Sequence, residues 1–346
     1  MRAQAMRTTE VGDGQLGWVL AHDLEASDGR VLLNKGAVLD EAALKHFQSA
    51  SPGEVHLLEL EADELHENAA GLRIAQAAAG DGIGISGPLT SRYDLLAERK
   101  GLLRVDAGLL RAINRVEDVT VYTLLDRQPV LPGAVLASVK VTPIAMPEAR
   151  VAEVEALCRA QPLLRVLPFQ PKRVAVLALE ALAGEQRSRF EAVIDKKLRW
   201  YGSHLIDLRY VAPQTELVAE TLRAFLSSGA ELILAAGGNP IDPLDPLEQA
   251  LPAVDARFVH KGAPTRGSMS WLARAGDVPI YNLASCRMWT GNTVADLVLP
   301  LLLTSSEVTP DDIREIGYGG LLGTAMAFRF PPYDRDSGDI VAGSER

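Results

Sequence analysis

The sequence is poor in cysteine and contains no long uninterrupted apolar run. Its two cysteines, Cys158 and Cys286, lie far apart and in no metal-like spacing, which argues against a disulfide framework and a zinc site. The N-terminal stretch lacks the apolar run of a signal peptide, and the apolar stretch at 294–303 is broken by Asp296 and Pro300. We therefore expect a reduced, cytoplasmic setting and no membrane span.

An excess of basic residues is also missing. The formal net charge is -10, which favours solubility and argues against a general nucleic-acid or anionic-membrane surface, although it leaves room for a local basic pocket. The 346 residues are 47% apolar, enough for a sizeable core and for two domains.

Four regions of the sequence differ in composition and in the spacing of their apolar residues. Residues 1–80 predict a mixed α+β region with helices over 41–48 and 64–79, capped by Asp40 and Asp63. Residues 81–170 combine short apolar runs with Gly and Pro and predict a small β-rich subdomain that carries helices at 107–116 and 148–161. Residues 306–346 form a C-terminal extension, expected to be disordered beyond about Phe328.

Residues 171–305 alternate regularly between strand-like and helical segments. The predicted strands are 173–178, 203–210, 231–235 and 278–283, and the predicted helices are 186–201, 215–228 and 288–302. This alternation indicates an α/β domain of three layers, a parallel sheet with helices on both faces. Such sheets bind ligands beyond the carboxyl ends of their strands, so the loops after Ala178, Ala235 and Leu283 are the candidate site.

The loop after Ala235 pairs two glycines with two carboxylates. Gly237 and Gly238 let the backbone approach a ligand closely. Asp242 and Asp245, each followed by Pro, are candidate ligands for Mg²⁺ held against a phosphate or a pterin-linked dithiolene. The alternative is a Gly-Gly turn followed by aspartates that cap the next helix.

Two further loops carry positive charge. The segment 260–268 contributes Lys261, Arg266 and Ser268, which suit a phosphate or carboxylate, or else form a solvent loop between strands. The loop after Leu283 places Ser285, Cys286 and Arg287 at a helix start, where backbone N–H groups and a guanidinium favour an anion. The alternatives there are a Ser285 cap beside a surface arginine, and for Cys286 a small buried residue rather than a nucleophile.

Taken together, the order of these loops resembles the molybdopterin-binding domain shared by molybdopterin adenylyltransferases and molybdotransferases, over about residues 171–303. The resemblance implies a pterin pocket lined by Gly237, Gly238, Asn239, Asp242 and Asp245, with the 283–286 loop as its second wall. The runs LGWVLAHDL (16–24), NKGAVL (34–39), HENAA (66–70), GLLRVD (101–106) and TPDDIREIGYGGLL (309–322) resemble a bacterial subgroup described as molybdopterin-binding or molybdopterin-biosynthesis proteins.

The sequence departs from this family at three places. The Thr-Gly pair usual after the first strand is absent, and Glu180 stands in for the acidic residue. Ala284-Ser285 replaces the Pro-Gly of the second loop, and Pro240 replaces a Ser or Thr of the first. These changes remove hydroxyl donors and a flexible glycine that would surround a phosphate.

The resemblance leaves three functions open. The first is an enzyme of molybdenum cofactor biosynthesis that binds molybdopterin or its adenylated form. In this enzyme Asp242 and Asp245 would position Mg²⁺. The negative charge of the phosphate or oxyanion would be neutralised by Lys261, Arg266 and Arg287. The second is a carrier or sensor that binds the same ligand without turnover and serves a molybdoenzyme or other cofactor-assembly proteins. The third is a scaffold without pterin affinity.

Two further expectations follow. The family resemblance implies a homo-oligomer. We also expect the loop carboxylates to matter more for ligand affinity than for stability, because such residues seldom support a core.

Overall fold

A computed structural model describes residues 1–89, 91–265, 268–304 and 307–335. The chain forms two compact units. Unit 1 comprises residues 1–97, 105–124 and 135–165, and unit 2 comprises residues 98–104, 125–134 and 166–346, within the described ranges. The predicted boundaries at residues 80, 170 and 305 stay a prediction.

Unit 1 is built from short strands and four helices. Its sheets have the strand orders β1-β5-β2, β10-β12-β8-β7, β13-β6 and β3-β4. The elements are β1 (Arg2–Arg7), β2 (Val19–Leu20), β3 (Leu24–Glu25), β4 (Val31–Leu33), α1 (Glu41–His46), β5 (Glu54–Glu59), β6 (Glu64–His66), α2 (Glu67–Ala78), β7 (Ile83–Leu89), β8 (Arg92–Ala97), α3 (Ala107–Ile113), β10 (Val119–Thr123), β12 (Val135–Val141), β13 (Ala145–Pro147) and α4 (Glu148–Cys158).

The helix predicted at 64–79 begins three residues late, and its predicted cap is wrong. Residues Glu64–His66 form β6 and pair with β13, so they are extended rather than helical. The helix α2 starts at Glu67, where His66 Nδ1 accepts a hydrogen bond from the backbone N–H of Asn68. The Asp40 cap is confirmed, because its carboxylate accepts the N–H of Ala43 at 2.7 Å.

Unit 2 contains a six-stranded sheet in the order β16-β15-β17-β20-β19-β18. The strands β15 (Arg173–Ala178), β16 (His204–Tyr210), β17 (Leu232–Ala236) and β20 (Val278–Leu283) are parallel. They agree with the predicted strands to within one residue at each end. A separate three-stranded sheet has the order β11-β9-β14, formed by β9 (Gly101–Val105), β11 (Pro129–Val130) and β14 (Leu164–Pro168).

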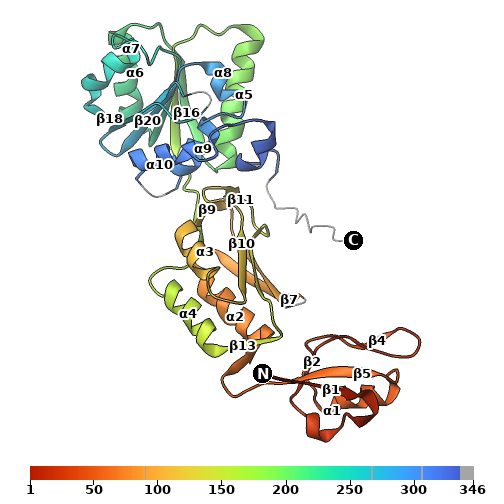
Figure 1. Cartoon of the computed structure of the whole chain (residues 1–346). Helices are drawn as coiled ribbons and strands as arrows, with labels where there is room; N and C mark the ends of the chain where they lie inside the picture. Colours follow the sequence, from red (N-terminus) through yellow and green to blue (C-terminus); the bar gives the residue numbers. More distant parts are fainter. Residues whose placement is uncertain (90, 266–267, 305–306, 336–346) are drawn as a thin grey trace. The chain divides into compact units, whose positions relative to one another are not determined.

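Helices cover both faces of the six-stranded sheet (Figure 1). One buried cluster joins β15 and β17 to α5 (Gly184–Trp200), α8 (Cys286–Trp289) and α9 (Ala295–Leu302). A second cluster joins the opposite face to α6 (Thr215–Ser227) and α7 (Pro246–Ala250). The central strands β15 and β17 are almost continuously apolar because both of their faces are buried.

The prediction of a wholly parallel sheet is incomplete. The strands β18 (Ala256–Lys261) and β19 (Ser270–Ala275) extend it in antiparallel register next to β20. The helix predicted at 288–302 is also divided, because α8 ends at Trp289 and α9 begins at Ala295. The Thr293 hydroxyl donates to the carbonyl of Met288, and Thr293 N–H donates to Asp296, so a turn replaces a continuous helix here.

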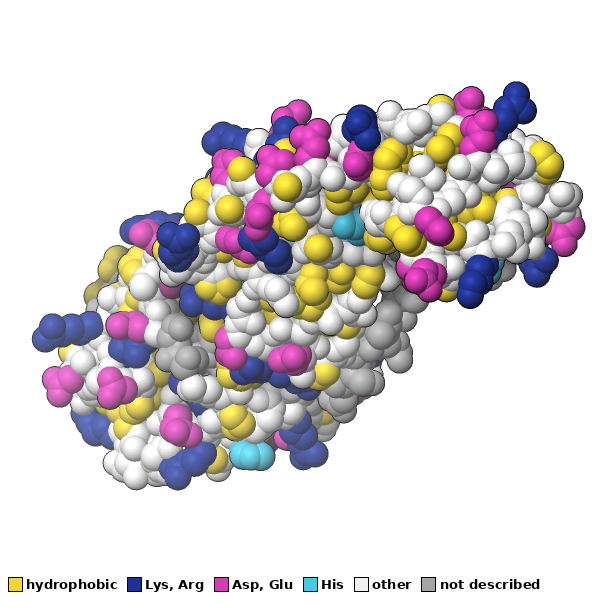
Figure 2. All heavy atoms as spheres, turned by 90° about the horizontal axis from the view of Figure 1, so that it is seen from below, with side chains coloured by type: hydrophobic (Ala, Val, Ile, Leu, Met, Phe, Trp, Pro, Cys, Tyr) yellow, Lys and Arg dark blue, Asp and Glu magenta, His cyan; other side chains and the backbone are white. Residues whose placement is uncertain are grey.

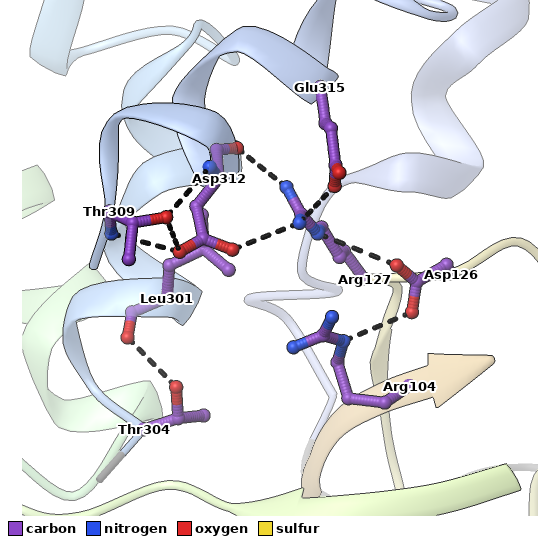
Figure 3. A network of polar contacts seen from close by, with 8 residues as sticks. All are labelled: Arg104, Asp126, Arg127, Leu301, Thr304, Thr309, Asp312 and Glu315. Carbon is purple, nitrogen blue, oxygen red and sulfur yellow. Dashed lines mark hydrogen bonds and ion pairs between the residues drawn. The ribbon is translucent and has the colours of Figure 1, made fainter. Parts of the chain in front are cut away.

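The C-terminal extension packs on unit 2 through α10 (Pro310–Arg314) and the short helical turns 315–317 and 324–329. Arg127 donates to the carbonyl and carboxylate of Asp312 and to Glu315, and it also pairs with Asp126 (Figure 3). Phe330 and Tyr333 pack with the core of unit 2. The disorder predicted beyond about Phe328 is therefore wrong for residues 329–335, and its remainder, 336–346, lies outside the described residues.

Candidate functional site

The carboxyl ends of β15, β17 and β20 meet at one edge of the sheet. The N–H of Leu179 donates to the carbonyl of Ala236 at 2.8 Å, and the N–H of Gly237 donates to the carbonyl of Leu283 at 2.9 Å. These bonds continue the strand pairing by one residue and bring the three loops together. The sequence prediction that Gly238 and Cys286 lie at the same end of the sheet agrees with this arrangement.

The two glycines of the β17 loop are required by its conformation. Gly237 and Gly238 have φ values of 105° and 85°, a region that side chains disfavour. A Cβ on Gly238 would lie 2.9 Å from Asp245 Oδ2. The loop therefore closes tightly around the Asp245 carboxylate.

Asp245 is buried, and its carboxylate binds the protein's own backbone. It accepts hydrogen bonds from the N–H groups of Asn239, Leu247 and Glu248 at 2.6, 3.0 and 3.3 Å. These bonds cap α7 and tie the loop to the helix start. This is the capping arrangement that the sequence leaves open as the alternative to a metal ligand.

The paired aspartates do not fit a preformed Mg²⁺ site. Asp242 is exposed, and its carboxylate accepts the N–H of Leu244 at 2.9 Å in a local turn. Mg²⁺ needs several converging oxygen ligands. In the parts of the chain that the structure describes, no cluster of three or more His, Cys, Asp or Glu residues could hold a metal.

The loop after β20 uses its backbone N–H groups internally. Ser285 caps α8 by accepting the N–H of Arg287 at 3.2 Å, and Glu180 Oε1 accepts the N–H of Cys286 at 3.3 Å. Burial, and to a smaller extent the nearby Glu180 carboxylate, raise the pKa of the Cys286 thiol to about 12. Cys286 is therefore a neutral buried thiol and not an activated nucleophile.

A cleft of about 570 Å³ opens beside Glu180 and Cys286. Its volume falls within the usual range for small-molecule sites. Its walls come from the loop after β15, the first turns of α5 and the segment from α8 into the following turn. The lining residues are Glu180, Leu182, Gln186, Arg189, Phe190, Cys286, Arg287, Thr290 and Gly291.

Two arginines supply the positive charge of this cleft. Arg189 is exposed on α5, Arg287 is exposed on α8, and within the described ranges neither forms an ion pair. A guanidinium presents a planar set of donors that matches a phosphate or carboxylate. The cleft therefore suits a small anionic ligand, and the half-buried Leu182 offers it an apolar contact, whereas Phe190 is fully buried beneath the cleft wall.

The α5 side of the cleft was not predicted from the sequence. Gln186, Arg189 and Phe190 are spaced by three and four residues, so they lie on one face of a helix. That spacing was the available signal, but only the register of α5 against the sheet shows that this face points to the strand ends. Thr290 and Gly291 were missed because the helix was predicted to continue through them.

The basic loop between β18 and β19 lies at the same edge of the sheet, since the N–H of Ala284 donates to the carbonyl of Met269 at 3.0 Å. Lys261 pairs with the buried Glu248 of α7 and lies 4.2 Å from the ring centre of Phe258, so its charge is largely engaged within the protein. Ser268 is exposed. Arg266 lies outside the described residues.

The charges elsewhere are mixed. On the face shown in Figure 2, Lys and Arg side chains lie among Asp and Glu side chains, in keeping with the net charge of -10. No helix among the described residues is long and apolar enough to cross a lipid bilayer.

Comparisons with known proteins gave matches among solved structures alone. No protein-family description matches the chain, and no curated protein does so either. The molybdopterin biosynthesis Mog protein of Mycobacterium ulcerans is 21% identical, with 38% of this chain covering 97% of that protein at a TM-score of 0.30. MogA is 25% identical, with coverages of 38% and 95% and a TM-score of 0.28.

A third solved structure, molybdenum cofactor biosynthesis protein B, is 12% identical, with coverages of 39% and 95% and a TM-score of 0.30. The first and third of these neighbours are named as molybdopterin or molybdenum cofactor biosynthesis proteins, and each of the three matches covers about two fifths of this chain. Because the TM-scores are low, these likenesses carry no argument about the function of this chain.

Proposed function

We propose that this protein binds molybdopterin, or its adenylated form, in the cleft beside Glu180 and acts in molybdenum cofactor biosynthesis. The observation that carries the proposal is the pair of unpaired arginines, Arg189 and Arg287, in a cleft at the carboxyl ends of parallel strands. Molybdopterin is a phosphate monoester, and a guanidinium pair suits its phosphate. The loop order that resembles molybdopterin-binding domains supplies the pterin part of the proposal.

Calorimetric titration with purified molybdopterin tests this function. We expect saturable binding of one ligand per chain, weakened when Arg189 and Arg287 are both replaced by Ala. The titration is repeated with Mg²⁺, because a bound phosphate would bring oxygen ligands that the loop aspartates do not provide alone. Absence of binding in both conditions would refute the proposal.

A second candidate is a carrier or sensor that binds the same ligand without turnover. The position of Asp245 favours it, since this carboxylate already accepts three backbone N–H groups. The missing Thr-Gly and Pro-Gly pairs favour it as well. An assay for adenylate release and for molybdate incorporation separates the two, because only the enzyme gives product above the rate without protein.

A further inference from the structure

A buried ion pair lies directly behind one wall of the cleft. Lys197 of α5 and Asp296 of α9 are 4% and 0% exposed, and their charged atoms lie 2.7 Å apart. Lys197 Nζ also donates to the carbonyl of Gly291 at 2.8 Å. Gly291 lines the cleft, so one hydrogen bond separates the ion pair from the ligand site.

Asp296 fixes the same turn from its other end. Its Oδ2 accepts the N–H of Thr293 at 2.8 Å, while Lys197, bound to its Oδ1, holds Gly291. The Thr293 hydroxyl in turn donates to Met288 of α8. The position of the turn 290–293 therefore depends on where the Asp296 carboxylate is held.

The C-terminal segment supplies a further donor to this carboxylate. The Tyr333 hydroxyl donates to Asp296 Oδ1 at 2.6 Å, and the Tyr201 hydroxyl lies 3.4 Å from that of Tyr333. Burial raises the pKa of both phenols well above the usual value, so both keep their protons. The indole N–H of Trp200 donates to the carbonyl of Arg335, which holds the same segment in place.

We propose that Tyr333 and Asp296 are positioning residues for the ligand cleft, through which docking of the segment 331–335 sets the turn 290–293. This inference rests on the proposed function, because it takes the cleft as the ligand site. Oδ1 of Asp296 is shared between Lys197 and Tyr333. Loss of the Tyr333 hydroxyl leaves the buried Asp296 carboxylate with one strong hydrogen-bond donor fewer. The Lys197–Asp296 ion pair and the turn 290–293 then shift to compensate.

The test compares Tyr333→Phe with Asp334→Asn in the full chain. Asp334 belongs to the same segment, but its pair with Lys196 is 88% and 50% exposed, so its loss disturbs the segment without reaching Asp296. The first readout is amide hydrogen exchange of residues 290–293 without ligand. The second is the Kd for molybdopterin by calorimetry, at a temperature where thermal melting shows both variants folded.

In Tyr333→Phe we expect exchange of the Thr293 amide to accelerate about tenfold. We expect the Kd for molybdopterin to rise about threefold or more. Changes of this size correspond to a free energy of about 1 kcal/mol, the contribution of one hydrogen bond. Both values stay at the wild-type level in Asp334→Asn. Unchanged exchange, or an unchanged Kd in a variant that loses only melting temperature, overturns the inference while the proposed function stands. If the wild-type chain binds no molybdopterin, the proposed function fails, and the inference fails with it.

Discussion

The N–H of Cys286 donates to Glu180 Oε1 over 3.3 Å, and this bond joins two residues 106 positions apart in the chain. It links the loop after β15 to the start of α8, and both segments line the cleft that carries Arg189 and Arg287. The cleft is therefore built across two strand ends rather than within one loop. Its chemistry depends on residues whose proximity only the fold creates.

Arg189 and Arg287 should contribute to ligand affinity and hardly to stability. We expect Arg189→Ala and Arg287→Ala each to raise the Kd for molybdopterin about tenfold, because a hydrogen-bonded charged contact contributes about 1.5–3 kcal/mol. Both side chains are exposed, so the unfolding free energy should change by less than about 0.5 kcal/mol. Calorimetry and urea unfolding measure the two quantities.

Arg199→Ala is the matched control for this pair. Arg199 lies on the same helix as Arg189, but it is 74% exposed and pairs with Asp195 away from the cleft. Its replacement should leave the Kd unchanged. An equal loss of affinity in Arg199→Ala would mean that overall charge, not the cleft, attracts the ligand.

Asp245 should matter for stability, whereas Asp242 should not. The structure reverses the sequence expectation for Asp245, because this carboxylate is buried and accepts three backbone N–H groups. Loss of such a cap lowers the unfolding free energy by about 0.5–2 kcal/mol. We expect Asp245→Ala to lie at the upper end of this range, because it leaves buried N–H groups without a hydrogen-bond acceptor. Asp242→Ala should change the unfolding free energy by less than about 0.5 kcal/mol, as urea unfolding would show. Equal effects of the two substitutions would contradict the capping role.

How far the sequence predicts this site is clearest at particular residues. The parallel strands were predictable because runs such as residues 174–178 of β15 are continuously apolar, as is typical of strands buried on both faces. The strand β18 was not, since Arg257, His260 and Lys261 give an edge strand the appearance of a polar loop. Local capping rules identified Asp40, but they misplaced the start of α2, because pairing between β6 and β13 is a long-range contact.

The same limit applies to the cleft. Glu180, Cys286 and Arg287 were predicted because they follow strand ends, and the structure brings them together. Arg189 shares one face of α5 with Gln186 and Phe190, but this spacing alone does not show that the face lies at the strand ends. The Lys197–Asp296 pair was equally hidden, since charged residues on helices are mostly solvent-exposed and only packing shows that these two are buried.

Cys286 should make stability fall in alkaline solution. Folding raises the pKa of its thiol from 9.0 to about 12, so between these pH values the folded chain binds more protons than the unfolded chain. The unfolding free energy must therefore decrease as pH rises through that window. Urea unfolding at pH 8, 9 and 10 should show the decrease, and Cys286→Ala should show a smaller one. The decrease should persist in part, because burial also raises the pKa of the Cys158 thiol and, at the upper end of this pH range, that of Tyr281. Identical pH dependence in the two chains would refute the assignment.

Removal of one partner from the Lys197–Asp296 pair should destabilise unit 2 strongly. Lys197→Met leaves Asp296 fully buried without its counter-charge, a change that typically costs about 3–5 kcal/mol. Lys196→Met removes the neighbouring lysine, whose pair with Asp334 is exposed, and should cost less than about 1 kcal/mol. Denaturant unfolding compares the two variants directly. A small effect of Lys197→Met would mean that Asp296 takes up a proton or reaches solvent, and Tyr333 would then have no fixed carboxylate through which to act on the cleft.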